Sequence, residues 1–564
     1  MTTSTTRTLE TAWWHADSSR DLWDVSVGEL LSRTATRWPD RTALVYGSPV
    51  PSERQRWTYR ELMADVVARA HWLAGLFSPG ERVAVCGPNG PEWPLLQYAL
   101  SLAGLVMVPV NPAYRPRELE HVLADSASVG VVHVDTDHGT DVGGVIATLR
   151  PRLPALREVV PWSDVVDRSR SSSQRPLPKV VGSDLVQVQY TSGTTGFPKG
   201  ALLCHRAVIN SARFVAEAGG LPEGGVWINP MPIFHLGSNV TAALGTLARG
   251  GTHVLVPRFA AALISELIEG ERGNVSLLVP TMILDLLNDP ATTTRDLSSL
   301  CGILTGATTV PAPLVERTRR ELGCDVTVLY GQTEVSGNLT RTHRHDDARL
   351  QAETVGQPLP GVEVRVVDTA TGATQAVGVV GELRVRGYQA MVGYLGAPEQ
   401  TAETLDADGW LATGDLATMD EHGYIRIVGR TKDVVVRGGL NIYPREIEDV
   451  LYEHREVGQA SVVADLDDRL GEVPVAAVIP RRRGAGAGLD TEFEDLAARL
   501  DEHCRERLAP YKVPVRWFVV TAFPLTPTQK VQKNVLREWI ATGRIRATAE
   551  DGRPRTPRLS EPSR

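Results

Sequence analysis

The chain has 564 residues, of which 42% are hydrophobic and 22% are charged, and its formal net charge is −8. This composition is typical of globular proteins, and the length corresponds to roughly three or four domain-sized units. The net negative charge is spread along the chain and argues against a nucleic-acid-binding groove. The sequence has no run of about 18 apolar residues, so we expect no transmembrane segment.

The amino-terminal segment and the cysteines bear on the cellular location. Residues 1–14 are rich in threonine and lack the apolar core of a secretory signal. The cysteines Cys86, Cys204, Cys301, Cys324 and Cys504 are scattered and never form a C-x-x-C pair. This pattern indicates reduced thiols and neither disulfides nor a zinc site, and we expect a cytoplasmic protein.

Residues 58–135 alternate between helical and strand-like patterns. We predict helices over residues 59–76, 94–103 and 116–124, and strands over residues 82–86, 106–110 and 129–134. Apolar strands separated by helices predict a parallel sheet that is covered on both faces. The polar residues 167–174 predict a surface loop, which is followed by a short buried strand at residues 186–189.

The second half of the chain predicts a smaller and more β-rich organisation. A further alternating block covers residues 254–329, and strands are then predicted at residues 362–367, 381–385 and 424–428. After residue 429, strands at 434–436, 460–463 and 475–479 alternate with helices that begin at Pro444 and Thr491. Residues 545–564 are rich in Arg, Pro and Ser and predict a disordered tail.

We therefore predict an α/β fold of two domains and a tail. The large N-terminal domain, residues 1–429, would combine parallel-rich sheets and helices with a small β subdomain. Residues 430–544 would form a small, mobile α+β C-terminal domain, and residues 545–564 the tail.

The segment from Tyr190 to Gly200, Tyr-Thr-Ser-Gly-Thr-Thr-Gly-Phe-Pro-Lys-Gly, is the most informative part of the chain. It offers backbone N–H groups, hydroxyl donors and a lysine, which are the groups that bind a polyphosphate. It differs from the common P-loop in its glycine spacing and in the proline that precedes Lys199. A flexible Ser/Thr/Gly linker is the alternative, but such a linker would not normally follow a buried apolar strand.

Five further segments follow the 190–200 loop. They are Tyr-Gly-Gln-Thr-Glu at 330–334, Gly-Trp-Leu-Ala-Thr-Gly-Asp at 409–415, Gly-Arg-Thr-Lys-Asp at 429–433, Arg-Gly-Gly-Leu-Asn-Ile-Tyr-Pro at 437–444 and Pro-Thr-Gln-Lys-Val-Gln-Lys at 527–533. Together with the loop, they resemble the motifs of the adenylate-forming superfamily in their order. That superfamily includes acyl-CoA synthetases, adenylation domains and beetle luciferases, and the resemblance covers roughly residues 28–540.

The resemblance implies that ATP is bound at the 190–200 loop and at residues 333–334. The implied contacts to the β- and γ-phosphates are Thr191, Ser192, Gly193, Thr194, Thr195, Gly196 and Lys199. Glu334 is implied as the magnesium ligand, because a carboxylate is a hard oxygen ligand for a hard cation. Thr333 is implied as a hydroxyl contact to the α-phosphate. A turn carboxylate that binds no metal is the alternative for Glu334.

Other residues are implied to bind the nucleoside. Tyr330, with Gly331 beside it, resembles the aromatic residue that stacks on adenine, and Gly306-Ala307 would pass close to the base. The carboxylate of Asp415 would accept hydrogen bonds from the ribose hydroxyls, and Arg430 would contact the nucleotide at the domain junction. A core tyrosine and structural ion pairs are the alternatives for Tyr330 and for the two charged residues.

Lys530 resembles the catalytic lysine that reaches the α-phosphate and the acyl carboxylate in the first step. Gln529 stands where many relatives have glycine, and Lys533 is the nearby alternative. Lys432 matches the hinge about which the C-terminal domain rotates before the second step. Gly438 and Gly439 fit the loop that lines the channel for coenzyme A, with an ordinary tight turn as the alternative.

The segment at residues 231–238, Met-Pro-Ile-Phe-His-Leu-Gly-Ser, resembles the part of the family that borders the substrate carboxylate. His235 is therefore a candidate catalytic residue, and a buried histidine without substrate contact is the alternative. The residues expected around the acyl group are small or apolar and predict a neutral hydrophobic acid. They are Val335, Ser336, Gly337, Gly306 and Thr308.

The prediction is an AMP-forming acid–CoA ligase that uses ATP, Mg²⁺ and coenzyme A. It would convert a hydrophobic carboxylic acid (medium- or long-chain, cyclic or aryl) to acyl-AMP and then to acyl-CoA, releasing AMP and pyrophosphate. An acyl-AMP ligase that loads an acyl carrier protein is the alternative with the same residues, and an inactive adenylate-binding scaffold is the alternative from another class. A homodimer is a possible assembly.

Overall fold

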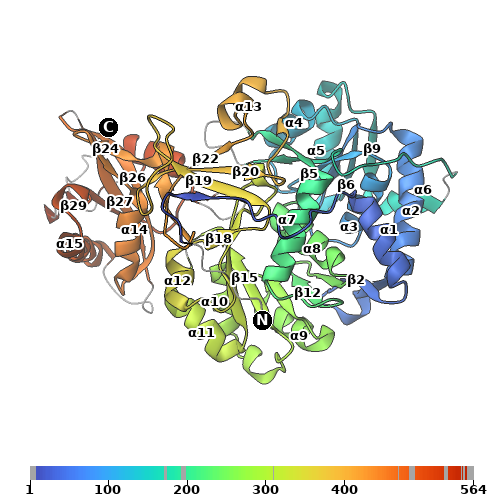
Figure 1. Ribbon diagram of the computed structural model, residues 1–564, viewed down its shortest axis with the longest axis horizontal. Helices are drawn as coiled ribbons and strands as arrows, with labels where there is room; N and C mark the ends of the chain where they lie inside the picture. Colours follow the sequence, from blue (N-terminus) through green and yellow to red (C-terminus); the bar gives the residue numbers. More distant parts are fainter. Residues whose placement is uncertain are drawn as a thin grey trace, which may run out of the picture.

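The computed structural model describes residues 8–170, 174–191, 198–308, 310–467, 469–481, 489–525, 531–545, 547, 549–550 and 553–554. Residues up to Arg430 form the larger body at the centre and right of Figure 1, and the C-terminal part lies at its left end. Two large sheets, a smaller β sheet and a C-terminal sheet are formed by the described residues. The predicted fold class is confirmed.

The first large sheet has the strand order β21-β11-β10-β5-β4-β6-β9. Its strands are β4 (Arg82–Cys86), β5 (Val106–Val110), β6 (Gly130–His133), β9 (Glu158–Pro161), β10 (Leu185–Tyr190), β11 (Gly200–Cys204) and β21 (Gly393–Tyr394). The strands from β10 to β9 in this order are parallel, whereas β11 pairs antiparallel with both β10 and β21. The antiparallel β10–β11 hairpin carries the 190–200 loop at its tip.

Helices cover both faces of this sheet. Alternate residues of a strand point to opposite faces, so neighbouring residues pack against different helices. Val83 and Met107 pack in the core with α1 (Val27–Arg37), α2 (Tyr59–Leu76) and α3 (Glu92–Leu102). Ala84 and Val108 pack on the other face against α4 (Pro116–Asp125) and α5 (Val142–Leu149). Helix α2 begins at residue 59 because Thr58 and Glu61 form a reciprocal capping box.

The second large sheet has the order β18-β17-β16-β15-β14-β12-β13-β2-β3. Its strands are β2 (Thr42–Tyr46), β3 (Gln55–Thr58), β12 (Val226–Asn229), β13 (Thr252–Leu255), β14 (Val275–Leu277), β15 (Gly302–Gly306), β16 (Asp325–Tyr330), β17 (Thr340–Arg341) and β18 (Gln357–Pro358). The helices that follow its strands in the chain are α9 (Ala261–Glu271), α10 (Pro280–Asn288), α11 (Ala312–Leu322) and α12 (Ala348–Glu353). Strands β2 and β12–β16 are parallel, so the C-terminal ends of β15 and β16 lie together at one edge.

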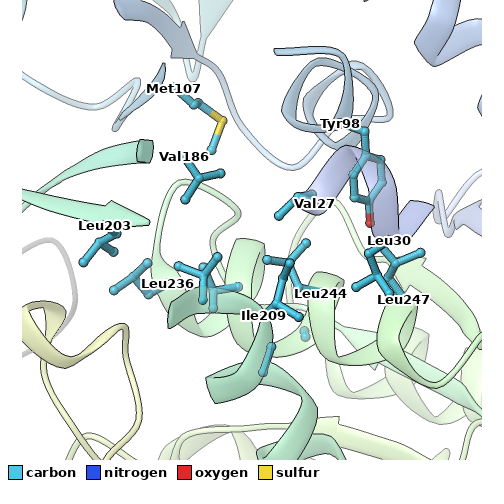
Figure 2. Packing of buried hydrophobic residues seen from close by; sticks show 14 of the residues in the cluster. Val27, Leu30, Tyr98, Met107, Val186, Leu203, Ile209, Leu236, Leu244 and Leu247 are labelled. Atoms are coloured by element: carbon cyan, nitrogen blue, oxygen red, sulfur yellow. The ribbon is translucent and has the colours of Figure 1, made fainter. Parts of the chain in front are cut away.

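Helices α7 (His205–Ala218) and α8 (Ala243–Ala248) lie between the two large sheets. Figure 2 shows Ile209, Leu244 and Leu247 of these helices packed with Val27, Leu30 and Tyr98 of α1 and α3. Most of α7 is buried, as expected for a helix with protein on every side. One core therefore joins both sheets.

A smaller sheet with the order β1-β19-β20-β22-β23 completes this body. Its strands are β1 (Trp13–Trp14), β19 (Val362–Val367), β20 (Gly381–Gly387), β22 (Leu411–Met419) and β23 (Ile425–Arg430). The inward residues of β19, among them Val362 and Val364, belong to the same core as α7. The predicted β subdomain is therefore present, and it is packed onto the main core.

The C-terminal part has its own sheet and its own two apolar clusters. The sheet contains β24 (Val435–Arg437), β25 (Leu440–Ile442), β26 (Val457–Asp467), β27 (Gly471–Pro480), β28 (Arg516–Val519), β29 (Ala549–Glu550) and β30 (Arg553–Pro554). One face packs against α14 (Pro444–Glu453) and α15 (Leu489–Arg507), and the other packs against α16 (Lys533–Ala541). The domain limits at residues 429 and 544 stay a prediction.

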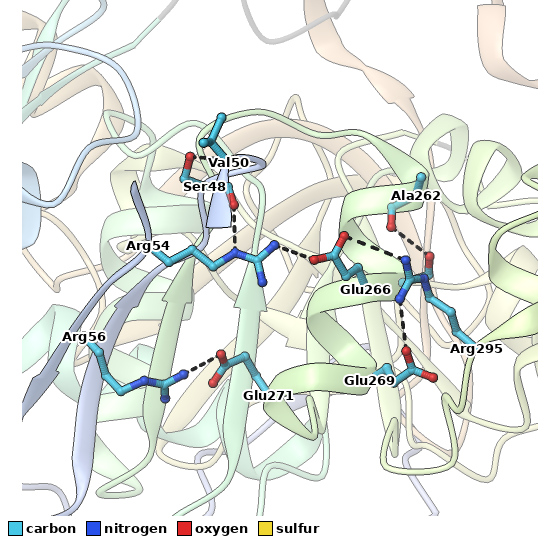
Figure 3. A network of polar contacts seen from close by, with 10 residues as sticks. Ser48, Val50, Arg54, Arg56, Ala262, Glu266, Glu269, Glu271 and Arg295 are labelled. Carbon is cyan, nitrogen blue, oxygen red and sulfur yellow. Dashed lines mark hydrogen bonds and ion pairs between the residues drawn. The ribbon is translucent and has the colours of Figure 1, made fainter. Parts of the chain in front are cut away.

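Surface ion pairs connect α9 to β3, to the residue just before β3 and to the segment around Arg295. Figure 3 shows Arg54 donating to Glu266 at 2.5 Å, while Arg295 donates to Glu269 at 3.0 Å. Arg56 pairs with Glu271 at 2.6 Å. Because these side chains are partly exposed, each pair contributes about 0–1 kcal/mol, and the buried apolar face of α9 contributes more.

Two segments differ from the sequence-based expectations. Residues 167–170 are helical and not part of a loop, because α6 (Trp162–Arg170) continues with Val165 and Ser169 buried and with Asp164 paired to Arg168. In the segment predicted as a tail, β29 pairs antiparallel with β28 and with β30. This pairing satisfies the edge of β28 that would otherwise be open.

We expect buried His205, the first residue of α7, to make the fold sensitive to acid. It is 0% exposed, its Nδ1 accepts a hydrogen bond from the Val27 N–H at 3.2 Å, and its Nε2 has no hydrogen-bond partner in the described part of the chain. Burial lowers the pKa of His205 from 6.5 to about 4. Burial also lowers the pKa of His253 to about 4.

We expect the free energy of unfolding to fall as the pH drops from about 6.5 to about 4, because the unfolded chain binds the His205 proton first. Between pH 7 and pH 5, this histidine alone accounts for a loss of about 2 kcal/mol. His205→Gln keeps an acceptor for Val27 and should lessen that loss in denaturant titrations. His345→Gln, at a side chain that is 86% exposed, is the control. Equal pH dependence in wild type and His205→Gln would contradict the expectation.

Candidate functional site

The β10–β11 hairpin presents the predicted phosphate loop. The Thr191 N–H donates to the Lys199 carbonyl at 2.9 Å and closes the base of the loop. On the other side, the Leu395 N–H donates to the Gly200 carbonyl at 2.8 Å, so β21 lies beside the loop base. Residues Ser192, Gly193, Thr194, Thr195 and Gly196 lie outside the described residues, and their phosphate contacts stay predictions.

Tyr330, Asp415 and Arg430 are brought together from β16, β22 and β23. The Tyr330 hydroxyl donates to Asp415 Oδ2 at 2.5 Å, and Arg430 Nε lies 3.0 Å from Asp415 Oδ1. The antiparallel register places Asp415 directly opposite Arg430. Although residues 330 and 415 are far apart in the sequence, the end of β16 meets β22 here.

Asp415 is only 5% exposed, and each of its two carboxylate oxygens has a partner, Tyr330 on Oδ2 and Arg430 on Oδ1. Burial and then the Asp415 carboxylate raise the pKa of the Tyr330 hydroxyl well above its usual range, so the hydroxyl stays a donor. A carboxylate offers about four lone-pair directions, and two are used by these contacts. The remaining directions are open to other donors, and the ribose contacts of Asp415 stay a prediction.

Glu334 lies in a 3₁₀ turn, η5 (Thr333–Val335), which follows β16 at the same edge. Its carbonyl accepts from the Met391 N–H at 2.8 Å, and its Oε1 accepts from the Tyr394 hydroxyl at 2.8 Å. Its Oε2 has no hydrogen-bond partner among the residues that the structure describes. A carboxylate with one oxygen fixed and one unpaired fits a Mg²⁺ ligand.

Tyr394 also contacts the predicted phosphate-binding lysine. The Lys199 ammonium lies 5.2 Å from the centroid of the Tyr394 ring, within the range of a cation–π contact. Tyr394 therefore contacts both Lys199, which precedes β11, and Glu334, which follows β16 of the other large sheet. We did not identify Tyr394 from the sequence, where the only signal was a tyrosine after glycine in Gly-Tyr-Leu.

Neighbouring backbone leaves no room for a side chain at Gly306 or at Gly331. A Cβ at Gly306 would lie 2.3 Å from the Leu329 carbonyl oxygen, and a Cβ at Gly331 would lie 2.4 Å from the Gly337 carbonyl oxygen. Ala307, the next residue after β15, has φ of +66°, which is uncommon for a residue other than glycine. Close approach of neighbouring backbone thus explains both glycines, and the adenine contacts stay predictions.

His235 precedes an irregular helix that the sequence did not predict. The Gly237 N–H donates to His235 Nδ1 at 3.2 Å, and residues 237–242 form a π-helix that leads into α8. A Cβ at Gly337 would lie 3.3 Å from the Cβ of Leu236, so the His235 segment lies against the turn that follows Glu334. Single π-turns are frequent at functional sites. A catalytic role for His235 stays a prediction.

The predicted hinge and hairpin lie where the C-terminal part begins. Lys432 belongs to a 3₁₀ turn, η6 (Thr431–Asp433), and burial and then Arg430 lower its pKa. Gly438 and Gly439 have φ of +57° and +83° and connect β24 to β25. Positive φ at both central residues is typical of a two-residue hairpin turn. The role of Lys432 as the hinge and the role of Gly438 and Gly439 in the coenzyme A channel stay predictions.

Lys530 lies outside the described residues, but its competitor Lys533 is described. Lys533 Nζ donates to Glu448 Oε1 at 2.7 Å, and the same oxygen accepts from the Val462 N–H at 2.8 Å. This ion pair holds α16 and α14 to β26 within the C-terminal part. Lys533 therefore has a structural partner, which favours Lys530 as the catalytic lysine.

Comparison with protein families identifies two matches that together span most of the chain. The family of AMP-binding enzymes matches residues 31–395, and the AMP-binding enzyme C-terminal domain matches residues 446–530. The medium-chain acyl-CoA ligase ACSF2 of Homo sapiens mitochondria is 34% identical over 548 residues, covering 91% of this chain and 87% of the relative.

Solved structures agree with this assignment. ATP-bound MatB from Rhodopseudomonas palustris has a TM-score of 0.79 and 29% identity, covering 91% of this chain and 98% of that one. The fatty acyl CoA synthetase of Mycobacterium tuberculosis has a TM-score of 0.73 and 28% identity, covering 92% and 98%. The prediction of an ATP-using acid–CoA ligase agrees with these relatives. The chain therefore belongs to the adenylate-forming family of AMP-binding enzymes.

Proposed function

We propose that the protein is an acyl-CoA synthetase that activates a hydrophobic, medium-chain carboxylic acid with ATP and transfers the acyl group to coenzyme A. The observation that carries the proposal is the convergence of Tyr330, Asp415 and Arg430 with Glu334 and Lys199, although these residues belong to or adjoin strands of three different sheets. The similarity to a medium-chain acyl-CoA ligase over 91% of the chain supports the choice of acid.

In the first step, the acid carboxylate attacks the α-phosphate of ATP and pyrophosphate leaves. Asp415 would accept hydrogen bonds from the ribose, with its orientation fixed by Tyr330 and Arg430. Lys199 would hold the leaving phosphates, and Lys530 would stabilise charge on the α-phosphate. Protein groups of this kind act by positioning and by electrostatic stabilisation of the transition state. Mg²⁺, held by Glu334 when bound, would neutralise phosphate charge.

The surroundings of the acyl group support a neutral tail. Residues 231–241 contain no Asp, Glu, Lys or Arg, and Ile233 and Leu236 in this segment are buried. Val335 on the facing turn is also buried. A pocket lined by such residues gives an acidic or basic substrate tail no counter-charge, so burial of that charge would be costly.

In the second step, the Gly438–Gly439 hairpin would replace Lys530 beside the adenylate after rotation about Lys432. The thiol of coenzyme A would then attack the acyl carbon and release AMP. We infer a cytoplasmic enzyme, since the described cysteines are all free, as is typical of proteins in a reducing compartment. Among the described residues, none of the helices combines the length and apolar character needed to cross a bilayer.

A thioester assay with competing acids tests the proposal. The enzyme is incubated with ATP, Mg²⁺, coenzyme A and equimolar aliphatic acids of 4 to 18 carbons, cyclic and aryl acids, a dicarboxylate and an amino acid. We expect acyl-CoA from the medium-chain acids, at least about tenfold faster than from the charged ones. A parallel reaction supplies a phosphopantetheinylated acyl carrier protein. Transfer to that protein but not to coenzyme A would favour the carrier-loading ligase, and preference for the dicarboxylate would contradict the hydrophobic pocket.

A further inference from the structure

Tyr394 connects two residues of the ATP site that come from separate parts of the chain. Its hydroxyl donates to Glu334 Oε1 at 2.8 Å, and its ring lies 5.2 Å from the Lys199 ammonium. Glu334 follows β16 of the second large sheet, whereas Lys199 precedes β11 of the first. In the described part of the chain, Tyr394 provides the direct side-chain link between them.

The backbone around Tyr394 fixes the position of the ring. Tyr394 lies opposite Ala201 in the antiparallel pairing of β21 with β11. Its N–H donates to Thr401 Oγ1 at 2.9 Å, and the same hydroxyl donates to the Ala397 carbonyl at 2.8 Å in the first turn of α13 (Pro398–Thr404). A strand on one side and a helix start on the other leave the ring little freedom.

The hydroxyl and the ring of Tyr394 make different polar contacts, one with Glu334 and one with Lys199. A phenolic hydroxyl is a hydrogen-bond donor, and the Tyr394 hydroxyl lies 2.8 Å from Glu334 Oε1. A protonated hydroxyl can donate to Glu334 Oε1 while Oε2 remains without a partner in the described chain. The face of the ring attracts the lysine, which by itself is a flexible side chain.

We propose that Tyr394 is a positioning residue for the ATP half-reaction, which orients the Glu334 carboxylate toward the metal–phosphate group and holds Lys199 beside the leaving phosphates. The inference rests on the proposed function only in taking MgATP as the ligand of this site. Tyr394 would act through its hydrogen bond to Glu334 and through its cation–π contact with Lys199. Tyr394 itself does not touch the reacting atoms.

Two substitutions separate these contacts. Tyr394→Phe keeps the ring and removes the hydrogen bond, and Tyr394→Leu removes both. Tyr424→Phe is the matched control, because the Tyr424 hydroxyl donates to Asp346 Oδ1 at 2.9 Å away from the ATP residues. Calorimetric titration of MgATP without acid or coenzyme A measures binding, and pyrophosphate–ATP exchange is measured against free Mg²⁺.

For Tyr394→Phe, we expect the Kd of MgATP and the Mg²⁺ concentration for half-maximal exchange to rise about tenfold, with AMP binding within twofold of wild type. Tyr394→Leu should weaken MgATP binding a further few-fold, and Tyr424→Phe should change none of these values. A Kd for MgATP within twofold of wild type in Tyr394→Phe would overturn the proposal. An equal loss of AMP binding would also overturn it, since that result indicates general damage to the site. If wild type binds MgATP but forms no thioester, the proposed function fails while this comparison still decides the role of Tyr394.

Discussion

Replacing Lys530 with alanine is expected to slow acyl-adenylate formation about 10²–10³-fold, while thioester formation from a supplied acyl-AMP stays within a few-fold of wild type. The resemblance to the family places this lysine at the α-phosphate in the first step only. Loss of one preorganised charge at a developing negative charge costs about this factor. Single-turnover assays of the two steps, followed as pyrophosphate release and as acyl-CoA formation, measure the two rates separately.

Lys533→Ala is the matched control for that experiment. Lys533 lies three residues away and is paired with Glu448 at 2.7 Å, so its loss should lower the melting temperature by a few degrees and leave adenylation within about twofold. If Lys533→Ala loses adenylation and Lys530→Ala does not, the assignment of the catalytic lysine is wrong. An equal loss of both half-reactions in Lys530→Ala would indicate a general role in place of one confined to the first step.

Replacing Asp415 with alanine is expected to raise the KM for ATP about 10²-fold and to lower kcat/KM by more. The substitution removes the proposed ribose acceptor and also the shared partner of Tyr330 and Arg430. Charge-assisted hydrogen bonds contribute about 1.5–3 kcal/mol each, and two lost ribose contacts account for the expected factor. Steady-state kinetics with ATP and with 2′-deoxy-ATP measure the effect.

The comparison of ATP with 2′-deoxy-ATP tests specifically whether Asp415 contacts the ribose 2′-hydroxyl. Wild type should prefer ATP over 2′-deoxy-ATP, and Asp415→Ala should lose that preference because the group that reads the hydroxyl is gone. Asp346→Asn is the control, since Asp346 also accepts from a tyrosine hydroxyl but lies outside the nucleotide site. A preference for ATP that persists in Asp415→Ala would assign the ribose to another residue. Asp415 would then be left with the structural role of neutralising Arg430.

The contacts of the C-terminal part bear on how the two half-reactions share one site. Asp433 of η6 lies 3.4 Å from Arg537 on α16, so the segment after Lys432 is tied to the C-terminal core. Thr431, one residue before Lys432, donates to the Gly414 carbonyl at 3.2 Å and is tied to the β subdomain. If the C-terminal part rotates about Lys432, as we predict, the pivot would lie between an anchor on each side, where a hinge can absorb rotation.

The sequence by itself determined the local elements and the family. Helix α2 over residues 59–76 and strands β4, β5 and β19 have the predicted bounds. A capping box fixes the start of α2, and apolar or alternating patterns with β-branched residues fix the strands locally. The order of six motifs identified the adenylate-forming family, and the residues of those motifs included Tyr330, Glu334 and Asp415. Local signals failed at residues 167–170, where the burial of Ser169 continues a helix through a polar stretch.

Only the tertiary structure decided which of these residues act on one another. Asp415 meets Tyr330 and Arg430 because β22 pairs with β23 and the end of β16 packs against it, which no local pattern encodes. Tyr394 joins Glu334 to Lys199 because β21 pairs with the edge of β11. The ion pair of Lys533 with Glu448 gives Lys533 a structural role that the sequence does not reveal. Sequence patterns report the preferences of a chain segment for its own conformation and burial. The partners of a polar side chain depend on long-range strand pairing, and only the folded chain brings them within hydrogen-bonding distance.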